Sequence, residues 1–195
     1  MLDLIGSSNM IQGSLTNFTS DRFGYPNAAL ALNGGWTQVP SGVYFNTPEF
    51  TISTWLFPQN IGIASRISDF GVGTTNNIVF AISYVYSLKP YSNICSGSNC
   101  IIVLSSQTVT LNKWQFIALT FNGTNASIYL NGALVASLGY IYSLPTVTRT
   151  SCYIGKSNWA GDGYSFSFLD DLRFYNKSLS QTEILELMNS NETSK

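Results

Sequence analysis

The chain has 195 residues, of which only 10% are charged, and its formal net charge is -1. This length is enough for one well-buried core, so we expect a single domain over residues 1–189 and a polar tail or linker over residues 190–195. The sequence has no basic run that would support nucleic-acid binding. It also has no apolar stretch near the roughly 20 residues that cross a bilayer.

The first half of the chain has the pattern of β-strands separated by turn residues. Residues 1–27, rich in Ser, Asn and Gly, predict an edge strand and a long loop. Residues 28–32 and 36–39 flank Asn33-Gly34-Gly35 and predict a hairpin. Further strands are predicted at residues 50–57, ending at Pro58, and in two β-rich runs at 62–70 and 78–86. Residues 84–100 are irregular and predict a projecting loop.

The strongest strand pattern covers residues 114–137. Residues 114–121 are apolar at nearly every position, which is typical of a strand covered on both faces. Residues 126–131 alternate apolar and polar side chains, so this strand has one buried face. Asn131-Gly132 suits a two-residue type I′ turn before a third strand. We expect Trp55 and Trp114, which lie in the best strand patterns, to be core residues.

The C-terminal part predicts a last strand at residues 166–175 and then the only helix. Ser180 and Glu183 have the spacing of a capping box, in which the two residues satisfy each other's free backbone donors. Apolar residues at 184, 185, 187 and 188 give the helix one hydrophobic side. Since so short a helix is marginal alone, we expect it to dock against the strands.

Several of these segments form a recognisable set. WQFIALTFNG at 114–123 precedes IYLNG at 128–132, and further segments lie at 21–24, 28–33, 50–55, 153–156, 169–176, 179–180 and 183–184. Together they resemble the laminin-G-like, or concanavalin-A-like, jelly-roll family over almost the whole chain. The resemblance implies an all-β fold, a two-sheet antiparallel jelly-roll sandwich with one short C-terminal helix.

The residues needed for catalysis are missing from the sequence. The chain has no histidine, so a Ser-His-Asp or Cys-His arrangement is excluded. A retaining glycosidase needs two carboxylates about 5 Å apart. The pair Asp170-Asp171 has no glutamate beside it, and Glu183 and Glu186 fall in the predicted helix. We therefore expect that the chain is not an enzyme.

Calcium is the one cofactor that the sequence predicts. Calcium binds oxygen ligands, and Asp170 occupies the position at which similar jelly rolls place a structural calcium ligand. Asp171 follows it, and Asp3 and Asn9 in the N-terminal segment are candidate companions. The alternative is that Asp170 and Asp171 pair with a nearby arginine, Arg22 or Arg173.

Aromatic residues in the irregular spans are the candidate ligand-binding groups, because sugar rings stack on Trp and Tyr faces. The chain has eleven Tyr and four Trp. The candidates are Tyr91, Tyr142, Trp159 and Tyr164, with Tyr84, Tyr86 and Tyr140 beside them. The alternative is that these rings only cover the edges of the sandwich.

Two further sequence features bear on the compartment. Cys95 and Cys100 enclose a short polar loop and predict a disulfide, which forms in oxidising compartments. A zinc site at these cysteines is disfavoured, because the chain has no histidine, and Cys152 is predicted to be a buried thiol. N-glycosylation sequons, in a number close to that expected by chance, occur at Asn17, Asn122, Asn125, Asn176 and Asn191.

Taken together, the sequence predicts a non-catalytic recognition or adhesion module outside or on the surface of the cell. It would bind a glycan or an extracellular protein through loops on a rigid scaffold, with calcium ordering some loops. The alternative is a structural subunit that assembles with itself or with neighbouring modules through edge strands and aromatic surface.

Overall fold

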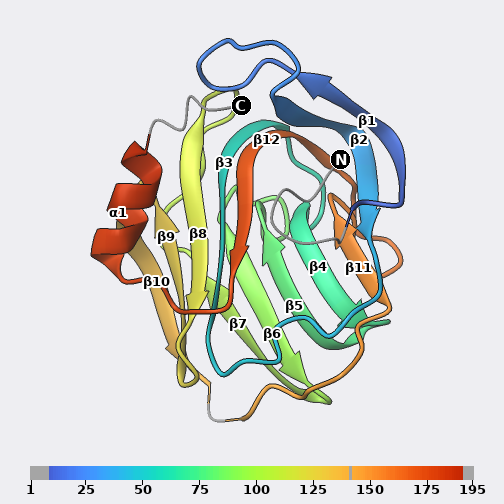
Figure 1. The fold of residues 1–195 in the computed structure, drawn as a ribbon, viewed down its shortest axis with the longest axis vertical. Helices are drawn as coiled ribbons and strands as arrows, with labels where there is room; N and C mark the ends of the chain where they lie inside the picture. Colours follow the sequence, from blue (N-terminus) through green and yellow to red (C-terminus); the bar gives the residue numbers. More distant parts are fainter. Residues whose placement is uncertain (1–8, 141, 191–195) are drawn as a thin grey trace.

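The computed structural model describes residues 9–140 and 142–190, and in this part of the chain it contains twelve strands and one short helix (Figure 1). The elements are β1 Gln12–Thr19, β2 Ala29–Val39, β3 Phe50–Asn60, β4 Arg66–Val72, β5 Thr75–Ala81, β6 Tyr91–Ser96, β7 Asn99–Leu104, β8 Gln115–Phe121, β9 Asn125–Leu130, β10 Ala133–Gly139, β11 Ser151–Ile154, β12 Ser165–Tyr175 and α1 Gln181–Asn189. The prediction of an all-β fold with one C-terminal helix is confirmed.

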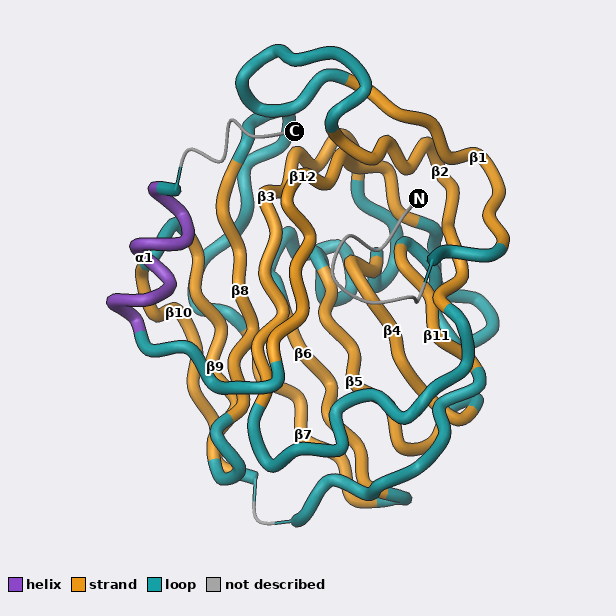
Figure 2. The backbone as a smooth tube through the Cα atoms, in the orientation of Figure 1, coloured by secondary structure: helices purple, strands orange, loops and turns teal. Residues whose placement is uncertain are grey.

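The strands form one antiparallel sheet that folds over on itself (Figure 2). Their order is β10-β9-β8-β3-β12-β2-β11-β4-β5-β6-β7, and β1 pairs with β2. The start of β2 pairs with β12, and its end pairs with β11. We call β10, β9, β8, β3 and β12 the first layer, and β11, β4, β5, β6 and β7 the second layer. The end strands β7 and β10 come close, so the sheet nearly closes.

The main core lies between the two layers. It contains Ile52 and Leu119 from the first layer and Ile78 and Ile94 from the second, each fully buried. Burying one such side chain stabilises the fold by about 1.5–3 kcal/mol. Because the cluster takes side chains from both layers, neither layer has a complete core of its own.

The predicted hairpin at Asn33-Gly34-Gly35 is wrong, because residues 29–39 form the single strand β2. Gly34 has a φ of +73°, and a Cβ on Gly35 would lie 2.3 Å from the carbonyl oxygens of Ser14 and Leu15. The glycines therefore let β2 bend between the layers while β1 stays alongside. The predicted N-terminal edge strand is confirmed as β1.

The projecting loop predicted at residues 84–100 is also wrong over most of its length, because residues 91–96 and 99–104 form the hairpin β6–β7. Polar residues interrupt the alternation of apolar and polar side chains in this segment, so the sequence pattern did not predict the two strands. Strand β3 continues through Pro58, where its pairing with β12 shifts register. Trp55 and Trp114 were predicted to be core residues, but both are half-buried and lie outside the main core. Trp114 packs against Phe57, with ring centroids 5.5 Å apart.

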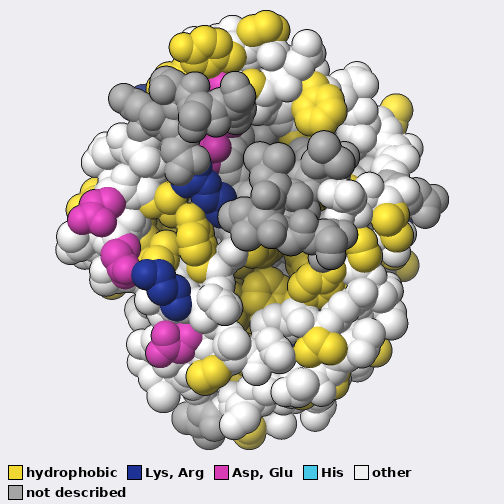
Figure 3. All heavy atoms as spheres, in the orientation of Figure 1, with side chains coloured by type: hydrophobic (Ala, Val, Ile, Leu, Met, Phe, Trp, Pro, Cys, Tyr) yellow, Lys and Arg dark blue, Asp and Glu magenta, His cyan; other side chains and the backbone are white. Residues whose placement is uncertain are grey.

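The helix α1 covers the outer face of the first layer. Ile184 of the helix and Leu179 just before it pack against Phe116 and Ala118 of β8. The predicted capping box of Ser180 and Glu183 is present. Charged side chains are sparse on the face drawn in Figure 3, which is mostly neutral and polar with scattered hydrophobic groups.

Candidate functional site on the outer face of the second layer

The outer face of the second layer carries a cluster of side chains separate from the main core. Phe70, Ile78, Phe80 and Ile94 point inward. The alternating residues of the same strands point outward, and they include Val79, Ala81 and Tyr91, which form the separate cluster with Ala64, Tyr84 and Trp159.

Three loops meet over this cluster, namely residues 61–65 after β3, 82–90 after β5 and 155–164 after β11. The amide of Gly163 donates to the carbonyl of Ile63 at 2.8 Å, and the amide of Ile82 donates to that of Ser65 at 2.8 Å. Tyr84 and Trp159 pack on the cluster, and the same loops carry the exposed residues Ile63, Val85, Tyr86 and Tyr164. We name these six residues the three-loop surface.

Arg66, at the start of β4, joins the loops from beneath. Its side chain is buried, with the residue 3% exposed. Nη1 donates to the Ala64 carbonyl at 2.7 Å and to the Tyr91 hydroxyl, and Nη2 donates to Ser157 Oγ at 3.1 Å and Asp162 Oδ2 at 2.7 Å. A planar guanidinium suits such a divided set of acceptors. Arg66 therefore fixes residues 157–162 relative to the sheet.

Asp69 holds the same loop from the sheet side. It accepts from the Asn158 amide at 2.9 Å, from Asn158 Nδ2 at 2.8 Å and from Asn77 Nδ2 at 2.7 Å, and it lies 3.6 Å from Arg66 Nε. Burial raises the pKa of Asp69, while its hydrogen bonds and Arg66 lower it in part. Because every one of these contacts is internal, Asp69 is a support for the loop.

The aromatic rings above this network remain open to ligands. Tyr86 is 58% exposed and Tyr164 is 46% exposed, while Tyr84 and Trp159 are half-buried. The Tyr84 hydroxyl and the Trp159 indole N–H make no hydrogen bond within the described part of the chain. The surface thus combines fixed ring faces with unused donors, a combination suited to a ligand with apolar faces and hydroxyl groups.

Of the four predicted ligand-binding aromatics, two lie on the loops of this surface and a third lies beneath it. Trp159 and Tyr164 belong to the three-loop surface, and Tyr91 lies beneath it, 5% exposed and 5.2 Å from the Tyr84 ring. Tyr142 instead packs on the buried Tyr140, with centroids 5.6 Å apart. The sequence analysis did not single out Arg66 or Asp162. The charged residues of RISDF at 66–70, in an otherwise β-rich run, were a signal that could have indicated a buried ion pair.

The structure also places the residues predicted to bind calcium. Asp170 and Asp171 both accept from Arg22 Nη1, at 2.5 and 2.6 Å, and Arg173 lies 3.4 Å from Asp171. This is the arginine pairing given above as the alternative. Asp3 lies outside the described residues, and among those that are described no three His, Cys, Asp or Glu side chains form a metal-binding group. Calcium binding here stays a prediction, and the two carboxylates that would bind the metal are already paired with the guanidinium group of Arg22.

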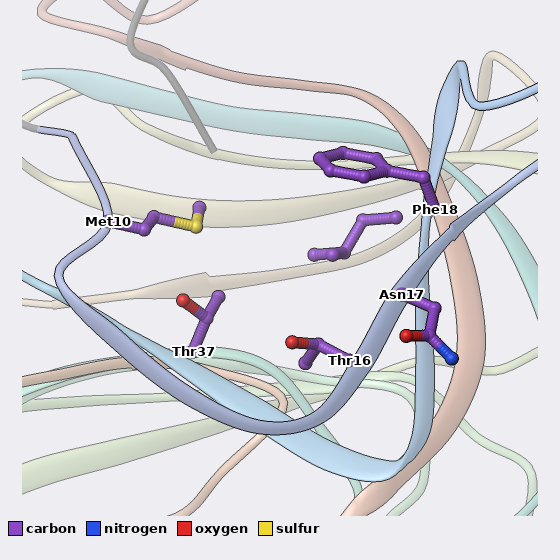
Figure 4. A pocket seen from close by; sticks show the side chains of 6 residues that line it. Met10, Thr16, Asn17, Phe18 and Thr37 are labelled. Atoms are coloured by element: carbon purple, nitrogen blue, oxygen red, sulfur yellow. The ribbon is translucent and has the colours of Figure 1, made fainter.

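A hollow of about 220 Å³ lies between β1 and β2 (Figure 4). The described residues that line it include no charged side chain and one aromatic ring; they are Met10, Thr16, Asn17, Phe18, Leu30 and Thr37. The hollow therefore offers less for recognition than the three-loop surface does.

The predicted disulfide and the predicted buried thiol are confirmed. Cys95 and Cys100 form a disulfide across the β6–β7 hairpin, and Cys152 is a buried free thiol. Burial raises the pKa of Cys152 to about 12. Four sequon asparagines, Asn17, Asn122, Asn125 and Asn176, are exposed, whereas Asn191 lies outside the described residues. Glycosylation stays a prediction.

Solved structures with the same fold include carbohydrate-associated and toxin domains. Domain 4 of an extracellular arabinanase from Geobacillus stearothermophilus, solved with arabinotriose, has a TM-score of 0.73 at 16% identity and covers 92% of this chain and 89% of its own. The binding domains of Paraclostridial Mosquitocidal Protein 1 and of botulinum neurotoxin serotype G have TM-scores of 0.66 and 0.68, each at 18% identity and over 96% of this chain. This chain spans 48% and 47% of those domains.

No curated protein sequence matches the chain. Among the described residues, no helix is long and apolar enough to cross a membrane. The sequence pattern of the concanavalin A-like lectin/glucanase superfamily matches residues 32–185. The chain therefore belongs to the concanavalin A-like lectin/glucanase superfamily.

Proposed function

We propose that the chain is a non-catalytic glycan-binding module that works outside the cell on a jelly-roll sandwich. Its binding site is the three-loop surface. The observation that carries this proposal is that Trp159 and Tyr84 lie over a cluster that Arg66 and Asp69 lock in place. A rigid aromatic pair loses little conformational entropy when a sugar binds. The arabinotriose complex of the similar arabinanase domain supports a sugar as the ligand class.

The acidic groups at the site support binding without catalysis. Asp69 is fully buried and accepts only from internal donors, so it has no route to a glycosidic bond. Asp162 uses Oδ2 to accept from Arg66 and from Ser157 at 2.7 Å. A glycosidase would need a pair of carboxyl groups that flank the bond, and these two face the arginine.

An extracellular location is supported by the Cys95–Cys100 disulfide, because disulfides persist in oxidising compartments. The exposed sequons fit the same location. Recovery of Cys95 and Cys100 as free thiols from secreted protein would contradict this part of the proposal.

A glycan array followed by calorimetry with arabinotriose and the best array ligands tests the function. Trp159→Ala should weaken binding by about 2 kcal/mol, the loss typical of a central aromatic contact, or roughly thirtyfold. Trp159→Phe, which keeps a ring face, should retain most of the affinity. Tyr142→Ala is the matched control, because Tyr142 is 44% exposed but lies outside the surface.

Two results would overturn the proposal. One is a wild-type chain that binds no glycan on the array. The other is a Trp159→Ala variant that keeps wild-type affinity and wild-type melting temperature.

Self-assembly is the second candidate, because β7 and β10 are edge strands without a charged residue. Four exposed aliphatic side chains lie on them, Ile102 at 45%, Leu104 at 40%, Leu134 at 51% and Leu138 at 45%. Uncharged edges of this kind favour pairing with another chain. Light scattering should then detect a dimer that Leu104→Lys dissociates and that Leu185→Lys, on the helix, leaves intact. A monomer at high concentration would remove this candidate.

A further inference from the structure

Lys156, next to the three-loop surface, is held between two aromatic rings. Its Nζ lies 4.4 Å from the ring centroid of Trp36 on β2 and 4.5 Å from that of Tyr153 on β11. The two rings are perpendicular, with centroids 5.5 Å apart. All three residues are half-buried. The rings therefore form a corner that fixes the ammonium group by cation–π attraction.

No carboxylate neutralises this ammonium group within the described residues. Most other fixed cations are paired: Arg22 with Asp170, Arg66 with Asp162 and Lys177 with Glu183. Within the described part of the chain, the ammonium group of Lys156 makes cation–π contacts with the two rings and no hydrogen bond or ion pair. Its three N–H donors are thus available to an acceptor from outside.

The register of the sheet places this group beside the proposed site. Tyr153 pairs with Asp69, and Asp69 pairs with Val79 of the outward cluster. Adjacent strands are about 4.8 Å apart, so Tyr153 lies two strands, or roughly 10 Å, from Val79. Lys156 also directly precedes Ser157, which contacts Arg66. A short oligosaccharide can reach from one place to the other.

We propose that Lys156 binds the acidic group, carboxylate or sulfate, of a sugar unit whose neighbouring unit lies on the three-loop surface. This inference rests on the proposed function. An ammonium bound to an anionic oxygen makes a charge-assisted hydrogen bond, which is stronger than a neutral one. The Trp36 indole N–H and the Tyr153 hydroxyl, which make no hydrogen bond in the described part of the chain, are donors for sugar oxygens nearby. The module therefore selects acidic glycans over neutral ones.

Calorimetry of the full chain with three matched probes tests the selection. The probes are arabinotriose, arabinotriose with a terminal carboxylate and arabinotriose with a terminal sulfate, so carboxylate and sulfate recognition are distinguished. We expect at least one acidic probe to bind about tenfold more tightly than the neutral one. Because salt screens charges, raising the salt concentration from about 20 mM to about 150 mM should reduce the difference in affinity between the acidic and the neutral probe.

Variants assign the effect to the lysine. Lys156→Met keeps the aliphatic stem between the rings and should abolish the preference while leaving arabinotriose affinity unchanged. Lys156→Arg should retain the preference. Lys113→Met, at an exposed lysine beside the first layer, is the control and should behave as wild type.

Each contrary result has its own meaning. Equal affinity for acidic and neutral probes overturns the inference, and neutral binding that still depends on Trp159 then leaves the proposed function intact. An acidic preference that survives Lys156→Met also overturns the inference. If none of the three probes binds, the inference falls, and the glycan array decides separately on the proposed function.

Discussion

Arg66 and Arg149 are both buried guanidinium groups, but among the described residues only Arg66 is paired with carboxylates. Arg149 is fully buried, and its Nη1 donates to the Tyr44 carbonyl. In the described part of the chain, Nε and Nη2 of Arg149 have no hydrogen-bond partner. Burial lowers the pKa of Arg149, because desolvation disfavours the charged form. Replacing each arginine with methionine should therefore change the stability of the fold in opposite directions.

We expect Arg149→Met to be neutral or to stabilise the fold by roughly 1–4 kcal/mol, because an apolar side chain fills the site without a buried charge. Arg66→Met should destabilise it by about 3–5 kcal/mol, because Asp69 and Asp162 lose their counter-ion. Urea unfolding of both variants measures the difference. A larger loss of stability for Arg149→Met than for Arg66→Met would contradict the assignment of carboxylate counter-ions to Arg66 alone of the two.

Arg22 decides between the two interpretations of Asp170. The side chain of Asp170 is fully buried and that of Arg22 is 7% exposed, so this ion pair is shielded from water. If Arg22 is the counter-ion, Arg22→Met should cost about 3–5 kcal/mol, and wild type should melt at the same temperature in calcium and in chelator. A melting temperature that rises with calcium would instead establish the predicted metal, since a ligand of the folded state stabilises it.

At the scale of elements, local patterns predicted most strands and long-range contacts decided the failures. The three strands within residues 114–137 were predicted correctly because their alternation and their Asn131-Gly132 turn are local. Asn33-Gly34-Gly35 suits a turn or a bend equally well, and the pairing of β1 selects the bend. Likewise Trp159 was found as an aromatic in a loop. The Arg66–Asp162 pair joins positions 96 residues apart, which no local pattern contains.

The bend in β2 makes Gly35 a sensitive position. A Cβ there would lie 2.3 Å from two carbonyl oxygens of β1, and backbone atoms move aside only at a cost. Gly35→Ala should therefore destabilise the protein, by roughly 1–3 kcal/mol, which chemical denaturation measures. Gly139→Ala on β10 is the matched control, because neither glycine has a left-handed φ and the nearest atom to the Cβ position of Gly139 is 3.8 Å away. Equal losses of stability in both variants would mean that the added methyl group in a strand, and not its contact with β1, explains the effect.

At the scale of the whole molecule, the two layers depend on one another. The main core takes side chains from both, β2 pairs with strands of both, and β7 lies close to β10 at the other end of the sheet. Opening one layer alone would expose the inner face of the other. A domain without separable cores unfolds in one cooperative step.

Hydrogen exchange measured by mass spectrometry can test this cooperation without any substitution. Peptides that cover β8 in the first layer and β5 in the second should report the same free energy of opening, equal to that of global unfolding. The strand β1 pairs only with β2 and should exchange at lower free energy. The loop of residues 155–164 should be better protected than β1, because Arg66 and Asp69 hold it to the sheet. Exchange of β5 at a much lower free energy than β8 would mean that the second layer opens alone. The three-loop surface would then lack the rigid support that glycan binding requires.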